Sequence, residues 1–139
     1  MSMIIEMLRK HEGVETHAYK CTANKTTIGV GRNIDPDGGI GLSSDEINYL
    51  LLNDIKRVDS EISGAFIWYR TLNTARKDAI MDMCFNMGLP RLSKFKKALA
   101  GMALGDYNEA ASEFLDSRWA KQVGQRAVTV TDIIRSGEY

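Results

Sequence analysis

The chain has 139 residues, of which 44% are hydrophobic and 26% charged, so one compact domain is expected and disordered or fibrous classes are excluded. Its 18 basic and 18 acidic residues balance, so no overall field favours nucleic acid or a stable association with a membrane surface. The two cysteines are too few for a disulfide framework, and we expect neither a membrane span nor a signal peptide.

The first forty residues predict a short helix followed by a small sheet. Ile4, Ile5 and Leu8 recur at helical spacing and Gly13 ends the pattern, which predicts a helix over residues 3–12 with Glu12 as its last residue. The segments "AYKC" and "TTIGVGRN" are rich in β-branched and aromatic residues, and "TANK" and "DPDGG" break the pattern. We expect an antiparallel hairpin or a three-stranded sheet here.

From Ser43 onward the pattern is helical. Ser43 and Glu46 form a capping box that begins a long helix over about residues 43–63. Asn73 caps a second helix, which is dense in apolar residues, and Gly88 ends it. The alternation in "AVTVTDII" also permits a strand, but a helix is favoured because the preceding elements are helical. Shorter helices are predicted from Ser93 to about Leu104, from Asp106, and from about Gln125 to Arg135.

These elements predict an α+β fold that is mainly helical. A small antiparallel sheet lobe, about residues 14–42, is joined by the long helix, 43–63, to a helical lobe over about 64–139. We assign the helix at 3–12 to the helical lobe and treat residues 1–139 as one domain. A cleft is expected between the two lobes.

Three residues near the sheet are candidates for chemistry. Glu12 ends a helix, where the partial negative charge of the helix dipole makes a carboxyl group a candidate proton donor. Cys21 lies among polar residues at a strand end, and Thr27 lies within a strand. Each alone is more often structural than functional. Gly29 and Gly31 lack the third glycine and the helix of a dinucleotide-binding motif, so nucleotide binding is dismissed.

Taken together, the spacing of these residues changes the interpretation. Eight residues separate Glu12 from Cys21, and five separate Cys21 from Thr27, which leads into "IGVG". This arrangement resembles the phage-type lysozymes, or endolysins, of glycoside hydrolase family twenty-four, in the subgroup with Cys at the second catalytic position. The resemblance covers nearly the whole chain, because "FNMG", "EAASEFLDSRW", "QRA" and "RSG" follow in the order of the family.

The resemblance implies a lysozyme-like fold and a muramidase that hydrolyses the β-1,4 bond between N-acetylmuramic acid and N-acetylglucosamine in bacterial peptidoglycan. Glu12 matches the general acid, and Thr27 matches the threonine that orients the attacking water. Cys21 takes the second catalytic position, where family members carry Asp or Cys. An inverting route, with Cys21 and Thr27 holding a water, is favoured, and a retaining route with thiolate attack stays open.

The resemblance also implies residues that bind substrate, and no metal or cofactor. Arg126 is expected to reach Glu12 and fix its orientation, while an ion pair between Arg32 and Asp54 is expected to tie the sheet to the long helix. The substrate-binding positions carried over are Asn33, Phe85, Asn86, Arg118 and Arg126.

The leading functional hypothesis is a monomeric endolysin that lyses the host cell. It would stay in the host bacterial cytoplasm until a separate holin-like protein gives it access to the periplasm and cell wall. The alternative is a catalytically weak or inactive peptidoglycan-binding relative, or a phage tail component. A cysteine peptidase is a third hypothesis, but neither His11 nor His17 lies in a known nucleophile context.

Overall fold

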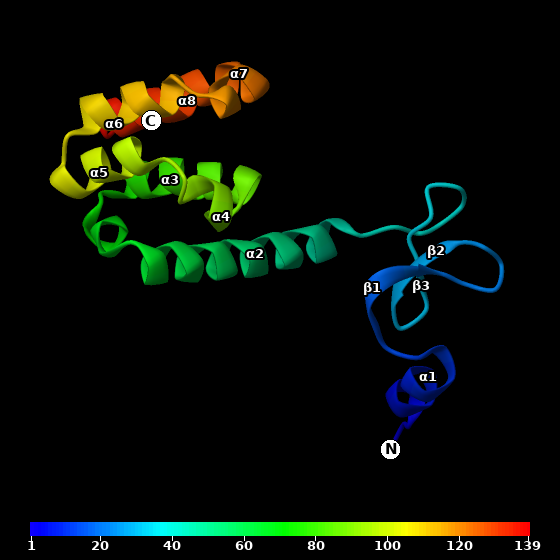
Figure 1. Cartoon of the computed structure of the whole chain (residues 1–139). Helices are drawn as coiled ribbons and strands as arrows, with labels where there is room; N and C mark the ends of the chain where they lie inside the picture. Colours follow the sequence, from blue (N-terminus) through cyan, green and yellow to red (C-terminus); the bar gives the residue numbers. More distant parts are fainter. The chain divides into compact units, whose positions relative to one another are not determined.

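The computed structural model describes residues 1–139, which divide into two compact units, Met1–Leu50 and Leu51–Tyr139 (Figure 1). Helix α2, Ser44–Ala65, begins in the first unit and continues into the second. No helix is both long enough and apolar enough to cross a lipid bilayer. The fold is α+β and mainly helical, as predicted.

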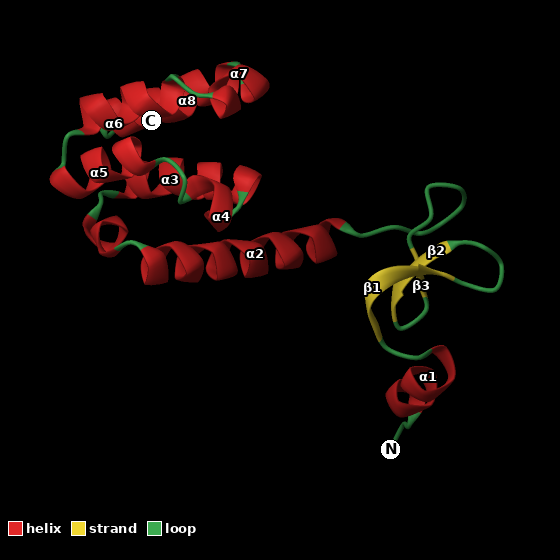
Figure 2. Cartoon of the chain, in the orientation of Figure 1, coloured by secondary structure: helices red, strands yellow, loops and turns green.

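The first unit contains a helix and a three-stranded antiparallel sheet (Figure 2). Helix α1, Ile4–Glu12, ends at Gly13, whose φ of 79° suits glycine. The strands lie in the order β1-β2-β3, so β2 is central. Thr27 of β2 pairs with Tyr19 of β1 and with Asn33 of β3, and is therefore in the middle of the sheet. The strands are β1 Glu15–Lys20, β2 Thr26–Gly29 and β3 Arg32–Asn33.

The second unit is a bundle of helices around one apolar core (Figure 1). Its centre holds Ile80 and Met83 of α3, Phe114 of α6 and Ile134 of α8, all fully buried. Burial raises the pKa of the Cys84 thiol in the same core, which leaves it an unreactive packing residue. The helices that follow α2 are a 3₁₀ helix Ile67–Thr71, α3 Thr74–Met87, α4 Leu89–Leu92, α5 Lys96–Leu104, α6 Tyr107–Leu115, α7 Arg118–Val123 and α8 Gln125–Ser136.

The predicted starts of the two helices capped by Ser43 and Asn73 are confirmed. The backbone N–H of Ser43 donates to the Glu46 carboxylate at 2.9 Å, and that of Glu46 donates to the Ser43 hydroxyl at 3.2 Å. The Asn73 side chain accepts from the backbone of Arg76 at 2.9 Å. The alternating segment near the C-terminus is helix α8, as favoured.

Two short helices, α4 and α7, were not predicted, and α5 begins at Lys96 rather than near Ser93. Helix α7 has six residues, too few to show a period in the sequence. It is nevertheless capped at its start by Ser117, whose hydroxyl accepts from the backbone of Ala120 at 3.2 Å, and Gly124 ends it.

Candidate active site

Glu12 lies against the turn that joins β2 to β3. A Cβ atom placed on Gly31 would come within 2.7 Å of one Glu12 carboxylate oxygen. Gly31 also has a φ of 68°, a conformation that other residues rarely adopt. Glycine at this position therefore leaves the room that the Glu12 side chain occupies.

Cys21 begins the turn that joins β1 to β2, residues 21–25. Its backbone N–H donates to the Lys25 carbonyl at 3.0 Å, and its carbonyl accepts from the backbone N–H of Asn24 at 2.8 Å. Backbone hydrogen bonding to the sulfur at Lys25, and then at Ala23, lowers the pKa of the thiol; desolvation opposes the shift, and the Thr27 hydroxyl adds to it. The half-buried sulfur is therefore easier to ionise than an ordinary thiol.

Thr27 directs its hydroxyl to the same turn. The side chain is only 4% exposed, and its hydroxyl donates to the Lys25 carbonyl at 2.9 Å. A hydroxyl has one proton and two lone pairs, so this bond leaves the oxygen able to accept a hydrogen from water. Cys21 and Thr27 thus meet at the backbone of Lys25.

Asn33 has a clear structural role in the loop after β3. Its side-chain carbonyl accepts from the backbone N–H of Asp35 at 3.0 Å, and its main-chain carbonyl accepts from Ile40 at 2.9 Å and Gly41 at 3.3 Å. These bonds close the loop over residues 33–41. A substrate contact from Asn33 stays a prediction.

The predicted ion pair between Arg32 and Asp54 is wrong. Arg32 instead forms two bonds to Glu46, at 2.7 and 2.8 Å, and donates to the Gly41 carbonyl at 2.9 Å. Asp54 pairs with Arg57 of its own helix at 3.2 Å. The eight residues from Glu46 to Asp54 correspond to about 12 Å of helix, and the short loop before α2 brings Arg32 to its first turn.

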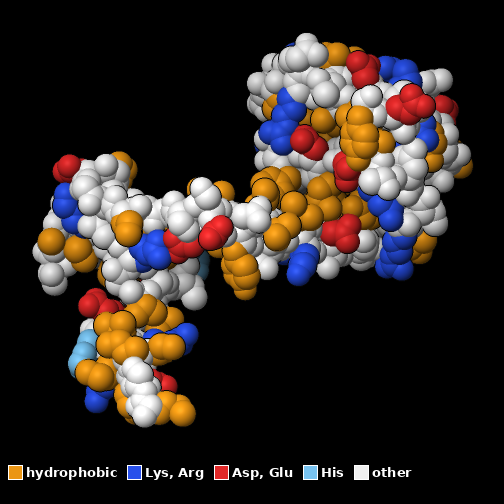
Figure 3. All heavy atoms as spheres, turned by 180° about the vertical axis from the view of Figure 1, so that it is seen from behind, with side chains coloured by type: hydrophobic (Ala, Val, Ile, Leu, Met, Phe, Trp, Pro, Cys, Tyr) orange, Lys and Arg blue, Asp and Glu red, His pale blue; other side chains and the backbone are white.

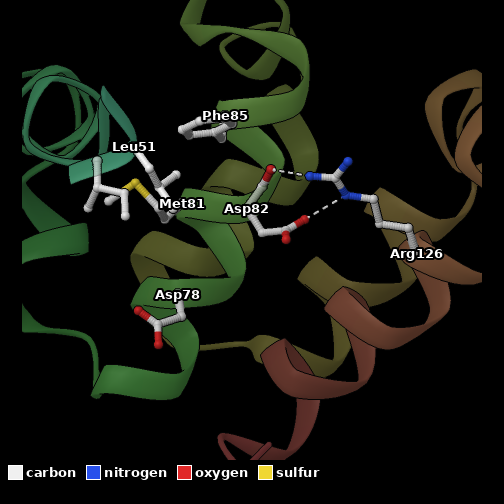
Figure 4. Close-up of a pocket in the computed structure, with 7 residues that line it drawn as sticks. Leu51, Asp78, Met81, Asp82, Phe85 and Arg126 are labelled. Carbon is white, nitrogen blue, oxygen red and sulfur yellow. Dashed lines mark hydrogen bonds and ion pairs between the residues drawn. The ribbon is translucent and has the colours of Figure 1, made fainter. Parts of the chain in front are cut away.

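In the second unit, two of the predicted binding residues line a hollow of about 270 Å³ (Figure 4). Phe85 of α3 is 44% exposed, and Arg126 belongs to α8. Figure 3 shows hydrophobic side chains gathered over this unit, and the exposed residues Leu51 and Ile55 of α2 belong to the lining. A mostly apolar lining with a few charged groups beside it is typical of small-molecule sites.

Arg126 is held by Asp82. Its Nε donates to a carboxylate oxygen of Asp82 at 2.8 Å and its Nη2 donates to the Asp82 carbonyl at 3.3 Å (Figure 4). The expected contact of Arg126 with Glu12 stays a prediction. Asp78 and Asp82 were missed in the sequence, although their spacing of four residues on α3 places them on one face of that helix.

The other two predicted binding residues are not part of this hollow. The side-chain carbonyl of Asn86 accepts from the indole N–H of Trp119 at 2.9 Å, which ties α3 to α7. Arg118 is exposed at the start of α7 and forms no ion pair. Substrate contacts from these two residues stay predictions.

Comparison with known proteins supplies the family. The model of the phage lysozyme family matches residues 9–133. The chain is 29% identical to the probable T4-type lysozyme 2 of Dictyostelium discoideum, over 99% of this chain and 96% of the relative. It is 28% identical to the endolysin of Acyrthosiphon pisum secondary endosymbiont phage 1, over 86% and 80%.

A third similarity is to part of a larger protein. The chain is 30% identical to the pre-baseplate central spike protein Gp5 of Enterobacteria phage T4, over 99% of this chain but only 28% of the spike protein. The family match takes in Glu12, Cys21 and Thr27 together with the hollow of the second unit. Because it extends over nearly the whole chain, this protein belongs to the phage lysozyme family and is a glycoside hydrolase.

Proposed function

We propose that this lysozyme hydrolyses the β-1,4 bond between N-acetylmuramic acid and N-acetylglucosamine in bacterial peptidoglycan. Glu12 acts as the general acid, and Cys21 and Thr27 place and activate the water. The observation that carries the proposal is the meeting of Cys21 and Thr27 at Lys25, in the unit that also holds Glu12 against Gly31.

The chemistry needs one group that gives a proton and another that prepares the nucleophile. The glycosidic oxygen leaves as an alcohol after it takes the proton of Glu12, while water attacks the anomeric carbon from the opposite face. Thr27 is placed to accept a hydrogen from that water, because its own proton is directed to Lys25. A Cys21 thiolate, favoured by its backbone contacts, accepts the second proton of the water.

This assignment favours inversion at the anomeric carbon. In the competing retaining route, the Cys21 thiolate itself attacks the sugar and water later releases it. In the inverting route the Thr27 oxygen accepts a hydrogen bond from the attacking water. A direct attack by the thiolate does not use this acceptor. NMR of the anomeric configuration in fresh product distinguishes the two routes.

The biological role that we propose is lysis of the bacterial host. One relative is named as an endolysin, and it aligns with 86% of this chain. On this proposal the enzyme acts as a monomer, remains in the host cytoplasm until a separate holin-like protein opens the membrane, and then degrades the wall.

The test is the clearing of permeabilised Gram-negative cells by purified variants. Glu12→Gln should lower the rate by about 10²–10⁴-fold, the usual contribution of a general acid. Glu15→Gln makes the same change at an exposed residue of β1 and should leave the rate unchanged. Full activity of Glu12→Gln would refute the assignment of the acid.

A series at the second position tests the task of the sulfur. Cys21→Ala should lose activity, while Cys21→Asp should retain a large part of it, because a carboxylate also accepts a proton from water. Cys21→Ser tests whether a hydroxyl suffices. Equal activity of Cys21→Ala and wild type would remove Cys21 from the mechanism.

A second candidate function is that of a phage tail component that binds or locally cuts peptidoglycan. The similarity to a stretch of the Gp5 spike protein favours it, because nearly the whole chain aligns there. Quantitative mass spectrometry of purified virions tests it. A fixed number of copies in each virion supports a tail component, and absence from virions supports a free endolysin.

A further inference from the structure

Both carboxylate oxygens of Asp35, in the loop after β3, accept hydrogen bonds from backbone N–H groups. One oxygen accepts from the backbone N–H of Thr26 at 2.9 Å, and the other accepts from the backbone N–H of Asp37 at 2.9 Å. The side chain is only 12% exposed. These hydrogen bonds lower its pKa to about 2, so the carboxylate stays ionised near neutral pH.

The contacts of Asp35 reach both ends of the turn that carries the candidate chemistry. Thr26 directly precedes Thr27, and Lys20 directly precedes Cys21. The Lys20 ammonium donates to the Thr26 hydroxyl at 2.9 Å and lies 3.8 Å from an Asp35 oxygen. Lys20 and Thr26 are also paired across β1 and β2. Asp35 therefore contacts both members of the last strand pair before the turn.

The rest of the loop supports the same arrangement. The backbone N–H of Ile34 donates to the Thr26 carbonyl at 2.9 Å, so Thr26 is bonded on both its N–H and its carbonyl by the segment around Asp35. The Asn33 side chain in turn holds the backbone of Asp35. Residues 22–24 lie at the open end of the turn and are exposed; the backbone N–H of Asn24 donates to the Cys21 carbonyl at 2.8 Å, but no side chain of the loop after β3 bonds to these residues.

We propose that Asp35 is a positioning residue of this lysozyme, which acts through Thr26 and Lys20 to fix the placement of Cys21 relative to Thr27. The inference rests on the function proposed above. A displacement of about 1 Å in a catalytic group can cost about 100-fold in rate, so a fixed turn has direct value for catalysis. Asp35 itself touches neither candidate group and takes no proton in the reaction.

The test compares Asp35→Ala with Asp37→Ala in the 139-residue chain. Asp37→Ala removes the same charge from the same loop, but it leaves the backbone N–H that donates to Asp35. Asp37 is almost fully exposed and pairs with Lys25, so this control also removes a surface ion pair. The kcat for peptidoglycan should fall about 10- to 100-fold in Asp35→Ala, with KM changed much less, because placement rather than binding is lost. Asp37→Ala should keep the wild-type kcat.

A second readout follows the Cys21 sulfur directly. The rate of iodoacetamide modification of Cys21, measured by peptide mass spectrometry against pH, reports the pKa of its thiol. Loss of charge alone lowers the pKa of a nearby thiol, whereas a loosened turn removes the backbone hydrogen bonds and raises it. We expect a shift to higher pH in Asp35→Ala and no upward shift in Asp37→Ala.

Asp35→Asn keeps one acceptor oxygen and should lie between wild type and Asp35→Ala in both readouts. An unshifted profile with wild-type kcat in folded Asp35→Ala overturns the proposal. If Asp35→Ala does not fold, the same wild-type behaviour in Asp35→Asn overturns it. The modification profile needs no activity, so it tests the placement of Cys21 even if Cys21→Ala proves active and the proposed mechanism fails.

Discussion

The two units of this protein are stabilised in different ways. The second unit has a continuous core in which residues such as Ile80 and Phe114 are fully buried. In the first unit, residues 1–50, Thr27 alone is buried, and the loops are held by hydrogen bonds to side chains. Packing therefore stabilises the helical unit, whereas polar contacts place the candidate catalytic groups. Function and stability should respond to different substitutions.

The largest expected effect is on the core of the second unit. Phe114→Ala removes a fully buried ring that lies 5.3 Å from the Phe95 ring, and it should lower the free energy of unfolding by about 3–5 kcal/mol. Leu115→Ala, one residue along the same helix and 40% exposed, should cost far less. Denaturant unfolding followed by circular dichroism measures both, and equal losses would contradict the assignment of the core.

The second-largest expected effect is in the first unit, where a substitution should change activity more than it changes the stability of the helical unit. Thr27→Val keeps the branched shape but removes the hydroxyl, and it should lower kcat about 10- to 100-fold, or about 1.4–2.7 kcal/mol. The helical unit should unfold as in wild type. Thr26→Val is the neighbouring control, and it should keep more activity because the backbone N–H of Thr26 still donates to Asp35. A fully active Thr27→Val would show that the hydroxyl serves only the turn.

A third prediction concerns the stability of the first unit at low pH. Bonds from Arg32 and then from the backbone of Ser43 lower the pKa of Glu46 from 4.5 to about 2. Because the pKa is lowered in the folded state, its stabilising contribution is complete above about pH 4.5 and is lost as the pH falls towards 2. Asp35, with a pKa of about 2, behaves in the same way. Amide NMR signals of β3, which contains Arg32, and of β2, which contains Thr26, should therefore broaden or shift in this range.

Glu46→Gln provides the control for the acid prediction. It removes the titrating group but keeps a polar side chain at the start of α2, so the pH dependence of the Arg32 signal in β3 should become flatter, while that of Thr26, which donates to Asp35, should remain. An unchanged dependence would assign the acid sensitivity of the first unit to other groups.

Local signals in the sequence were sufficient for much of the fold. The caps at Ser43 and Asn73 each involve residues within three positions, and both helices begin where predicted. The partner of Arg32 was not predictable in this way. Glu46 and Asp54 lie on the same helix, and the length of the loop before that helix determines which carboxylate Arg32 contacts. Helix α7 is too short to show a period.

The candidate site, like the fold, could be predicted only in part from the sequence. The spacing of Glu12, Cys21 and Thr27 identified residues of one unit, but the role of Asp35 depends on backbone hydrogen bonds that form only in the folded loop. Its only sequence signal is "DPDGG", which indicates a turn and not its contacts. Likewise, Asp82 and Arg126 are 44 residues apart, and their pairing follows from the packing of α3 beside α8.

The smallest expected effect on stability concerns Arg126 and Asp82, a charged pair at the surface of the well-packed unit. Both side chains are more than 40% exposed, so the pair should contribute less than about 1 kcal/mol to stability. If Arg126 binds substrate, Arg126→Gln should raise KM several-fold while the unfolding free energy stays within about 1 kcal/mol of wild type. Arg57→Gln, which removes two exposed ion pairs on α2, with Asp54 and with Glu61, is the matched control and should change neither quantity appreciably. A KM unchanged in Arg126→Gln would limit this arginine to holding Asp82 and would remove it from the predicted substrate-binding residues.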